Sequence, residues 1–483
     1  MEAYDWSSVD EFLDREEELE ALETWWSDPD RMPISLYGRR RTGKSWLFRR
    51  FAHGKPAMVL VARELAPGSQ LEEFATKLEP ALGVRPVISS LGELFRLLHR
   101  AARGQKLLVI IDEFPYLLPR TKAGTTRALT EIAAVMEEER DTSELKLVLC
   151  GSLVSEMESL MAERGPLHGR LRPLQLHPVD FGKARLFLPE HSPLEQFERY
   201  AITGGMPRYL SALAGSQALR TIVCREILSP NSALFNEGRV VLEQELNEPK
   251  VYFALLESLA TGDKDSGELA SALRSDAQRV SKYLSVLTDM RLVERLLPAG
   301  AAETSRAGRW HLRDPFFRFW FRYVLPFQDD LESGTPPATL YDTEIAQTLA
   351  EHVGKEFEKF CQHWVRATQS VSRVASWWGP ALHSLRRDGV RSTEEVDIVA
   401  TARGRVTLIG EARWRSKAMD VEYLNEIDTY KLPALRQSEL RVVQQPQIML
   451  FSRGGYTDRL RSAAGGRDDV TLVDVADALE ALV

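Results

Sequence analysis

The sequence has few cysteines, no long apolar runs and no excess of positive charge. Its three cysteines, Cys150, Cys224 and Cys361, stand far apart, which excludes a disulfide framework and a zinc site built from paired cysteines. This cysteine usage is typical of the reducing cytoplasm, where we expect the protein to reside. Residues 1–10 are acidic and polar, so no signal peptide is expected. The longest apolar runs, such as residues 107–111, are too short to span a bilayer, so no membrane contact is predicted.

The charge balance is slightly acidic. The chain has 62 Lys and Arg against 70 Asp and Glu, a formal net charge of −8. This excludes a uniformly basic DNA-coating protein but allows a local basic groove. With 44% apolar and 27% charged residues, the composition is that of a globular protein, and 483 residues predict about three domains.

One segment near the N-terminus predicts a phosphate-binding loop. Residues 34–37 form an apolar run, residues 38–45 fit the pattern GxxxxGKS, and residues 46–51 continue as a helix. Glycines at both ends allow the loop to curl so that backbone N–H groups face phosphate oxygens. Lys44 is expected to reach the β- and γ-phosphates, and the Ser45 hydroxyl to bind Mg²⁺. The predicted nucleotide-binding residues of this loop are Gly38, Arg39, Arg40, Arg41, Thr42, Gly43, Lys44 and Ser45.

A second segment supplies acidic partners for that loop. Residues 106–111 predict a strand buried on both faces, as in a parallel sheet, and the strand runs directly into Asp112 and Glu113. Asp112 is expected to hold Mg²⁺ through water, and Glu113 to polarise the attacking water. An acidic pair after a strand is often only a solvated strand end. Its combination with a phosphate loop favours the catalytic interpretation.

Two further residues are candidates with open alternatives. The predicted strand 145–150 ends at Gly151 and Ser152, so Ser152 either senses the γ-phosphate or the attacking water, or caps the next helix. Arg170 either senses or stabilises phosphate charge, or is a surface arginine paired with an acid.

These motifs, in this order, resemble the archaeal-type ATPases, relatives of the signal-transduction (STAND) P-loop ATPases and AAA-like in character. The resemblance begins at Phe12 and the run Asp14-Arg15-Glu16, and continues through the phosphate loop and the strand ends to Gly204-Gly205-Met206-Pro207. It implies a parallel α/β core with a helical lid and ATP as the ligand. It also implies that the backbone at Gly205 and Pro207 lies near the adenine, although the same residues fit a turn between helices.

The middle of the chain predicts a winged helix-turn-helix. Three short helical patterns within residues 251–290 precede two short strands at 292–297 and 309–312. The third helix either contacts DNA or packs within the protein as a regulatory module. Residues 314–340 are predicted to link this module to the last domain, with the best linker candidate at residues 329–337, which contain Gly334 and a Pro-Pro pair. The aromatic run at residues 314–323 either stacks bases or is a buried anchor for the next domain. The candidate DNA-facing residues are Arg274, Ser275, Gln278, Arg279 and Lys282.

The last third of the chain contains a second group of acids. Residues 394–400 and 405–410 predict a β-hairpin that turns at Gly404 and brings Asp397 and Glu411 side by side. Carboxylate oxygens suit Mg²⁺, which activates water against a phosphodiester.

This pattern resembles the PD-(D/E)xK restriction-endonuclease-like domains. The resemblance places Glu358 at the helix glutamate, Asp397 at the metal-binding aspartate, Glu411 at the ExK glutamate and Arg413 at the lysine. Arg413 departs from the motif: arginine keeps its proton, whereas a desolvated lysine can lose one. Arg413 can still bind a phosphate or stabilise developing charge. The domain therefore either cleaves nucleic acid or binds nucleic acid or a protein without cutting.

Together these features predict an α/β protein that acts as a Mg-ATP-dependent switch. It either licenses a nuclease-like domain that acts on DNA or other nucleic acid, or signals through a terminal domain that docks a protein partner or a second copy. The predicted parts are a P-loop ATPase core at 1–180, a helical lid at 181–248, a winged helix at 249–313, a linker at 314–340 and a restriction-endonuclease-like domain at 341–483.

Overall fold

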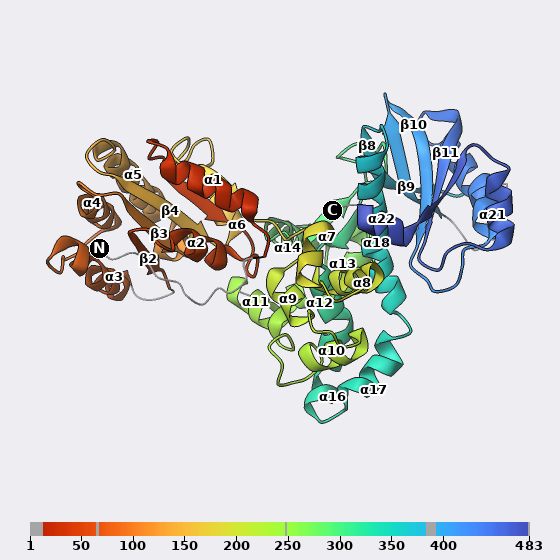
Figure 1. Ribbon diagram of the computed structural model, residues 1–483, viewed down its shortest axis with the longest axis horizontal. Coiled ribbons are helices and arrows are strands. Elements are labelled where there is room, and N and C mark those ends of the chain that lie inside the picture. The colour runs from red at the N-terminus through yellow and green to blue at the C-terminus, as the bar shows by residue number, and fades with distance from the viewer. Residues whose placement is uncertain (1–12, 64–66, 247–248, 383–392, 482–483) are drawn as a thin grey trace. The chain divides into compact units, whose positions relative to one another are not determined.

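The computed structural model divides the chain into two compact units (Figure 1). It describes residues 13–63, 67–246, 249–382 and 393–481, so Phe12 of the predicted motif lies outside the described residues. The first unit contains Met1–Val179 and Met206–Arg208, and the second contains Asp180–Gly205 and Tyr209–Val483. In the described part of the chain, every helix is too short or too polar to cross a membrane.

The first unit is built on a five-stranded parallel sheet with the strand order β2-β3-β4-β1-β5. The continuous apolar runs of β3 and β4 are buried, as expected for strands that are covered on both faces. The predicted parallel α/β core is therefore confirmed. The strands are β1(Ile34–Tyr37), β2(Ala57–Val61), β3(Leu107–Asp112), β4(Leu145–Gly151) and β5(Arg172–Gln175).

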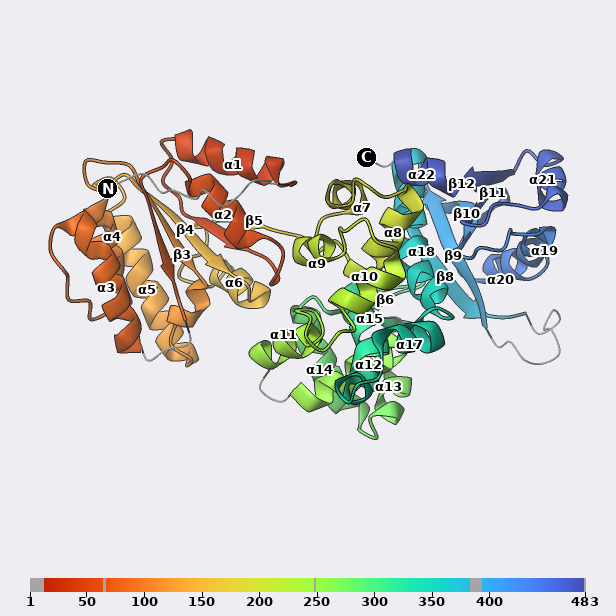
Figure 2. The ribbon, with the colours of Figure 1, turned by 60° about the horizontal axis from the view of Figure 1, so that its bottom comes forward.

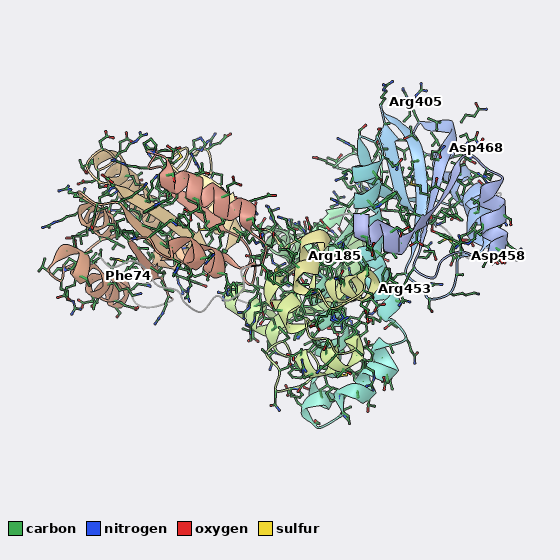
Figure 3. The ribbon with its side chains drawn as sticks, viewed as in Figure 1. Phe74, Arg185, Arg405, Arg453, Asp458 and Asp468 are labelled. Atoms are coloured by element: carbon green, nitrogen blue, oxygen red, sulfur yellow. The ribbon has the colours of Figure 1, made fainter. Side chains whose placement is uncertain are left out.

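Helices cover both faces of this sheet (Figures 1 and 2). Apolar side chains of α3, α4, α5 and α6 pack on one face, among them the fully buried Phe74, which Figure 3 labels. Those of α1 and α2 pack on the other face. The helices are α1(Glu16–Ser27), α2(Lys44–Ala52), α3(Pro67–Leu82), α4(Leu91–Ala101), α5(Lys122–Glu138) and α6(Val154–Leu160), with the 3-10 turn η1(Phe114–Leu117) after β3.

The second unit begins with a helical region. Its first helices, which include the segment predicted as a lid, are α7(Phe181–Ala184), α8(Pro193–Thr203), α9(Pro207–Ala212), α10(Leu219–Glu226) and α11(Glu237–Glu245). The first two residues of α9 belong to the first unit. The three helices and two-stranded antiparallel sheet expected over residues 249–313 follow, as α12(Pro249–Ala260), α13(Ser266–Ala272), α14(Ala277–Asp289), β6(Val293–Leu296) and β7(Arg309–Leu312).

The prediction that residues 314–340 form a linker is wrong. The segment folds into short helices whose aromatic side chains are buried, with Trp320 fully inaccessible to solvent. Its Gly and Pro residues bound helices: Gly334 has φ 104° after one helix, and Pro337 begins the next. The elements are α15(Pro315–Phe319), η3(Trp320–Val324), η4(Leu325–Phe327), α16(Gln328–Glu332) and α17(Pro337–Leu340).

The C-terminal part of the second unit is a mixed five-stranded sheet with the order β12-β11-β10-β9-β8. β8 to β10 are antiparallel, and β10 to β12 are parallel. The predicted hairpin is present as β9 and β10, and Arg405 projects from the start of β10 (Figure 3). The strands are β8(Arg373–Pro380), β9(Thr393–Ala402), β10(Arg405–Arg413), β11(Val442–Ser452) and β12(Val470–Asp474).

Helices cover both faces of this sheet as well (Figure 2). α18(Leu349–Thr368) and α22(Val475–Ala481) pack on one face together with α7 and α8. The other face is covered by α19(Val421–Glu426), the π-helical turn η7(Ile427–Lys431), α20(Leu432–Gln437) and α21(Asp458–Gly465).

Candidate functional site

The phosphate loop joins β1 to α2, and two glycines shape it. A Cβ on Gly38 would lie 2.4 Å from the carbonyl oxygen of Leu176, so only glycine fits beside β5. Gly43 has φ 94°, a left-handed conformation that glycine adopts without strain, and it precedes the first turn of α2. The loop therefore curls at both ends as the sequence pattern predicts.

Lys44 lies under this loop. Its Nζ donates to the carbonyl oxygens of Gly38 at 2.7 Å and Arg39 at 3.1 Å. Burial lowers the pKa of Lys44, while the nearby charges of Glu113 and Asp112 act to raise it. The structure thus brings the cation at position 44 and the acids at positions 112 and 113 into one electrostatic group.

Arg15 stabilises the phosphate loop through hydrogen bonds to backbone carbonyl groups. Its guanidinium donates to the carbonyl oxygens of Thr42 at 3.1 Å and His177 at 2.6 Å. The motif that contains Arg15 was visible in the sequence, but its contact with the loop was not, because the two are joined only in the folded unit. The other loop residues stay where the pattern places them: Thr42 is buried, and Ser45 is exposed in the first turn of α2.

Asp112, Glu113 and Ser152 meet at the carboxyl ends of β3 and β4. Burial raises the pKa of Asp112, whose Oδ1 accepts a bond from the Glu113 amide at 3.1 Å. Glu113 has φ 54°, and its Oε2 accepts bonds from the Ser152 amide at 3.1 Å and the Ser152 hydroxyl at 2.9 Å. Ser152 therefore orients the carboxylate that we predict to act on water.

The segment predicted to lie near the adenine is divided between the units. Pro207 belongs to the first unit, where its Cγ lies 4.0 Å from the point that a Cβ on Gly43 would occupy. Gly205 belongs to the second unit, so its role remains a prediction.

The structure does not bring Arg170 to the phosphate loop. Arg170 lines a cavity together with Arg31 and Pro33, which precede β1, and Leu145, which begins β4. This is the opposite end of the parallel strands from Lys44. Its guanidinium lies 3.9 Å from Glu137 on the surface, so the ion-pair alternative describes its contacts within the chain.

A second polar cluster lies on the C-terminal sheet. Asp397 of β9 and Glu411 of β10 stand on adjacent antiparallel strands, next to the paired residues Ile398 and Gly410. The forked guanidinium of Arg413 bridges them, with 2.5 Å to Asp397 Oδ2 and 2.5 Å to Glu411 Oε2.

Further charged groups surround this pair. Lys431 Nζ lies 2.5 Å from Glu411 Oε1, and Lys355 Nζ lies 3.2 Å from Glu358 Oε2 on α18. Burial, reinforced by the charge of Asp397, raises the pKa values of Glu411 and Glu358 to about 7. Burial acts to lower the pKa of Arg413, but the charges of Asp397 and Glu411 hold it above its ordinary value.

Sequence analysis missed Lys431. It follows Ile427 by four residues and precedes Leu435 by four, so it occupies the apolar stripe of a helix. A charged lysine on the apolar stripe of a helix was the one feature of the sequence that could have marked Lys431 as a candidate site residue.

The described residues contain no group of three or more His, Cys, Asp or Glu side chains arranged to hold a metal ion. Glu358 lies near Asp397, whose charge helps to raise the pKa of Glu358, but Arg413 and Lys431 occupy the carboxylate oxygens of Glu411.

The module with the two-stranded sheet contacts the C-terminal sheet. Trp378 Nε1 of β8 donates to the carbonyl oxygen of Ala307 at 2.9 Å, and Arg309 of β7 pairs with Glu395 of β9 at 2.5 Å. These contacts favour a packing role for this part of the module. Of the predicted DNA-facing residues, Ser275 is partly buried and four are exposed: Arg274, Gln278, Arg279 and Lys282.

Comparison with protein families identifies two parts of the chain. Residues 12–213 match the model of an ATPase domain predominantly from Archaea, and residues 320–427 match a family of archaeal and bacterial proteins of unknown function. The chain therefore carries a Walker-type P-loop ATPase domain, which implies nucleotide binding, followed by a C-terminal domain whose family has no assigned function.

Individual proteins and solved structures are similar to shorter or longer parts of this chain. An uncharacterized protein of Methanocaldococcus jannaschii is 26% identical over 423 residues, covering 85% of this chain and 89% of that protein. An uncharacterized ATP-binding protein of the same organism is 48% identical over 44 residues, covering 9% of this chain and 75% of that protein. The solved structure of a Walker-type ATPase of Pyrococcus abyssi matches with a TM-score of 0.50 and 20% identity, over 65% of this chain and 97% of that one.

Proposed function

We propose that the protein is a Mg²⁺-dependent ATP hydrolase that acts as a switch for its C-terminal domain. The observation that carries the proposal is the convergence of Lys44, Asp112, Glu113 and Ser152 at one edge of the parallel sheet. Ligands of open parallel sheets bind at this edge, where the strands end.

The residues present fit Mg²⁺. The Ser45 hydroxyl and the Asp112 carboxylate are hard oxygen donors, which Mg²⁺ prefers, and partial burial raises the pKa of Asp112. Bound there, the ion would neutralise charge on the β- and γ-phosphates. Ser45 and Asp112 are the residues that we assign to it.

Each protein group has a separate task in hydrolysis. Lys44 leaves the carbonyl oxygens of the loop and pairs with the phosphates, while backbone N–H groups of residues 38–45 surround them. Glu113 accepts a hydrogen bond from the water that attacks the γ-phosphorus, and Ser152 keeps the carboxylate directed at it. Pro207, beside Gly43, belongs to the segment assigned to the adenine.

Substitution of Lys44 tests the assignment of the loop. Lys44→Ala removes the cation that stabilises phosphate charge, so we expect ATP turnover to fall by more than about 100-fold with unchanged circular dichroism. The matched control is Lys122→Ala, which removes an exposed lysine at the start of α5 of the same unit. Turnover that survives in Lys44→Ala would mean that this loop does not hold the triphosphate.

For the C-terminal domain we propose metal-dependent hydrolysis of nucleic-acid phosphodiesters. The specific observation is that Asp397 and Glu411 lie side by side on β9 and β10 with Glu358 close to Asp397. Their carboxylates are the donor type that Mg²⁺ or Mn²⁺ takes, and the bound ion would activate water. Its entry requires the guanidinium of Arg413 to turn away from both carboxylates, toward a phosphate of the substrate.

Cleavage assays decide between this function and docking of a protein partner. We expect DNA or RNA to be cut in the presence of Mn²⁺ or Mg²⁺, and Asp397→Ala to abolish the cutting. Asp458→Ala removes an exposed acid of α21 and should leave it unchanged. Wild-type protein that cuts neither DNA nor RNA would favour the docking function, and cutting that persists in Asp397→Ala would place the nuclease site elsewhere.

A further inference from the structure

The carboxylate of Glu411 is held by two cations that come from different elements. Arg413 on the same strand contacts Oε2, and Lys431 at the end of η7 contacts Oε1, each at 2.5 Å. Glu411 is 1% exposed and Lys431 is 7% exposed. Both oxygens of this buried acid are therefore held by ion pairs, and the pair with Lys431 is buried on both sides, whereas the Arg413 side chain is 27% exposed.

Lys431 is costly to bury at this position. Its helical neighbours Ile427 and Leu435 belong to the apolar cluster that covers the sheet, and transfer of an ammonium from water into such surroundings carries a large desolvation penalty. An apolar residue of similar volume would pack there without that cost. A charged side chain retained at a core position, and directed at an acid of a candidate active site, indicates a role beyond packing.

Arg413 and Lys431 are not equivalent partners for Glu411. The forked guanidinium of Arg413 contacts both Asp397 and Glu411, so it stands between the two carboxylates. The compact ammonium of Lys431 donates to the other oxygen of Glu411, Oε1, and its hydrogen bond goes to Glu411 rather than to Asp397. When Arg413 turns toward a phosphate, Lys431 can stay in place and keep Glu411 oriented.

We propose that Lys431 supplies the ammonium that the Glu411-Ala412-Arg413 motif lacks, and that it acts as the positioning residue for Glu411. The inference rests on the proposed nuclease function of the C-terminal domain. It assigns different tasks to the two cations: Lys431 orients Glu411 for the chemical step, and Arg413 binds substrate phosphate. Loss of Lys431 should therefore lower kcat, and loss of Arg413 should mainly raise KM.

The test is Mn²⁺-dependent cleavage of a labelled oligonucleotide by the full-length chain and its variants. We expect Lys431→Ala to lower kcat by about 10- to 100-fold, the range for groups that orient metal-binding side chains, with KM changed less than about threefold. Lys431→Arg keeps the charge and should recover part of kcat, which also guards against loss of folding in the alanine variant. Lys417→Ala, which removes an exposed lysine of the same domain, should cleave as the wild type does.

A double variant asks whether Lys431 acts through Glu411. In a Glu411→Gln background, Lys431→Ala should cause no further loss of kcat, because the group that it orients has changed. Full kcat in Lys431→Ala, an additive further loss in the double variant, or an equal loss in Lys417→Ala would each overturn the inference while the nuclease function stands. A wild type that cuts no oligonucleotide would overturn the nuclease function and this inference with it.

Discussion

Ser152 holds the carboxylate of Glu113, the group that we propose to act on the attacking water. It makes two of the hydrogen bonds to Glu113, one from its amide and one from its hydroxyl, and it is itself buried at the end of β4. The hydrogen bond from the Ser152 amide to Glu113 remains when the side chain is replaced by that of alanine. The hydroxyl contact can therefore be tested by itself.

We expect Ser152→Ala to lower the kcat of ATP hydrolysis by about 10- to 100-fold, since one hydrogen bond to a charged group contributes about 1.5–3 kcal/mol. The KM for ATP should stay within about twofold, because Ser152 contacts Glu113 and not the loop. Steady-state phosphate release measures both, with Ser159→Ala, an exposed serine of α6, as the control. A raised KM with unchanged kcat would mean that Ser152 binds nucleotide instead.

Site residues that belong to a local sequence motif could be predicted from the sequence. Residues that contact the site from a distant position in the chain could not. The loop glycines, Lys44, Asp112 and Glu113 were identified because a phosphate loop and a strand end are local patterns. Lys431 reaches Glu411 across 20 positions, which no local pattern encodes. For Arg170 the sequence left two roles open, because its position in the chain did not reveal which end of the strands it faces.

A buried histidine connects the helix α4 to the start of the strand β4. His99 on α4 is 8% exposed, and its Nδ1 lies 2.7 Å from the hydroxyl of Ser143, just before β4. Burial lowers the pKa of His99 to about 4 from an ordinary value of 6.5. The neutral imidazole is thus the form that the folded unit accommodates.

This shift predicts that the first unit loses stability in mild acid. Between pH 6.5 and 4 the unfolded chain binds a proton at position 99 and the folded unit does not, so stability falls as the pH drops through this window and levels below it. Over the whole window, the free energy of unfolding of the first unit should fall by about 3 kcal/mol. Hydrogen exchange of peptides from α4 and β4 should show this loss in the wild type and in His53→Asn, whose histidine is exposed, but a smaller one in His99→Asn. Equal acid sensitivity in His99→Asn would contradict the assignment.

The elements themselves were predicted well where burial is continuous. β3 and β4 and the hairpin of β9 and β10 follow apolar runs that only a covered sheet accommodates. Residues 314–340 were misassigned because Gly and Pro mark helix ends as well as linkers. The aromatic run at residues 314–323 is buried, as one of the two alternatives for it expected, and the Trp320 indole N–H donates to the carbonyl oxygen of Phe235 at 2.7 Å.

For the whole molecule, the proposal joins an ATP-hydrolysing unit to a nuclease-like site in the same chain. If ATP turnover activates the C-terminal site, Mg-ATP should raise the rate of oligonucleotide cleavage. We expect an increase of about 5- to 100-fold, because coupling free energies between two sites in a protein are ordinarily of the size that gives such factors. Lys44→Ala should cleave at the basal rate with or without ATP. Cleavage that is equal in all four conditions would show that the two units work independently.

The most direct measurement of the central claim is the fate of labelled ATP on Glu113→Gln. We expect this variant, given Mg²⁺, to bind ATP at about one molecule per chain and to retain it through rapid desalting. Its hydrolysis should be about 100-fold or more slower than that of the wild type, because Glu113 acts on water and Lys44 holds the phosphates. Hydrolysis by Glu113→Gln at the wild-type rate would contradict the account.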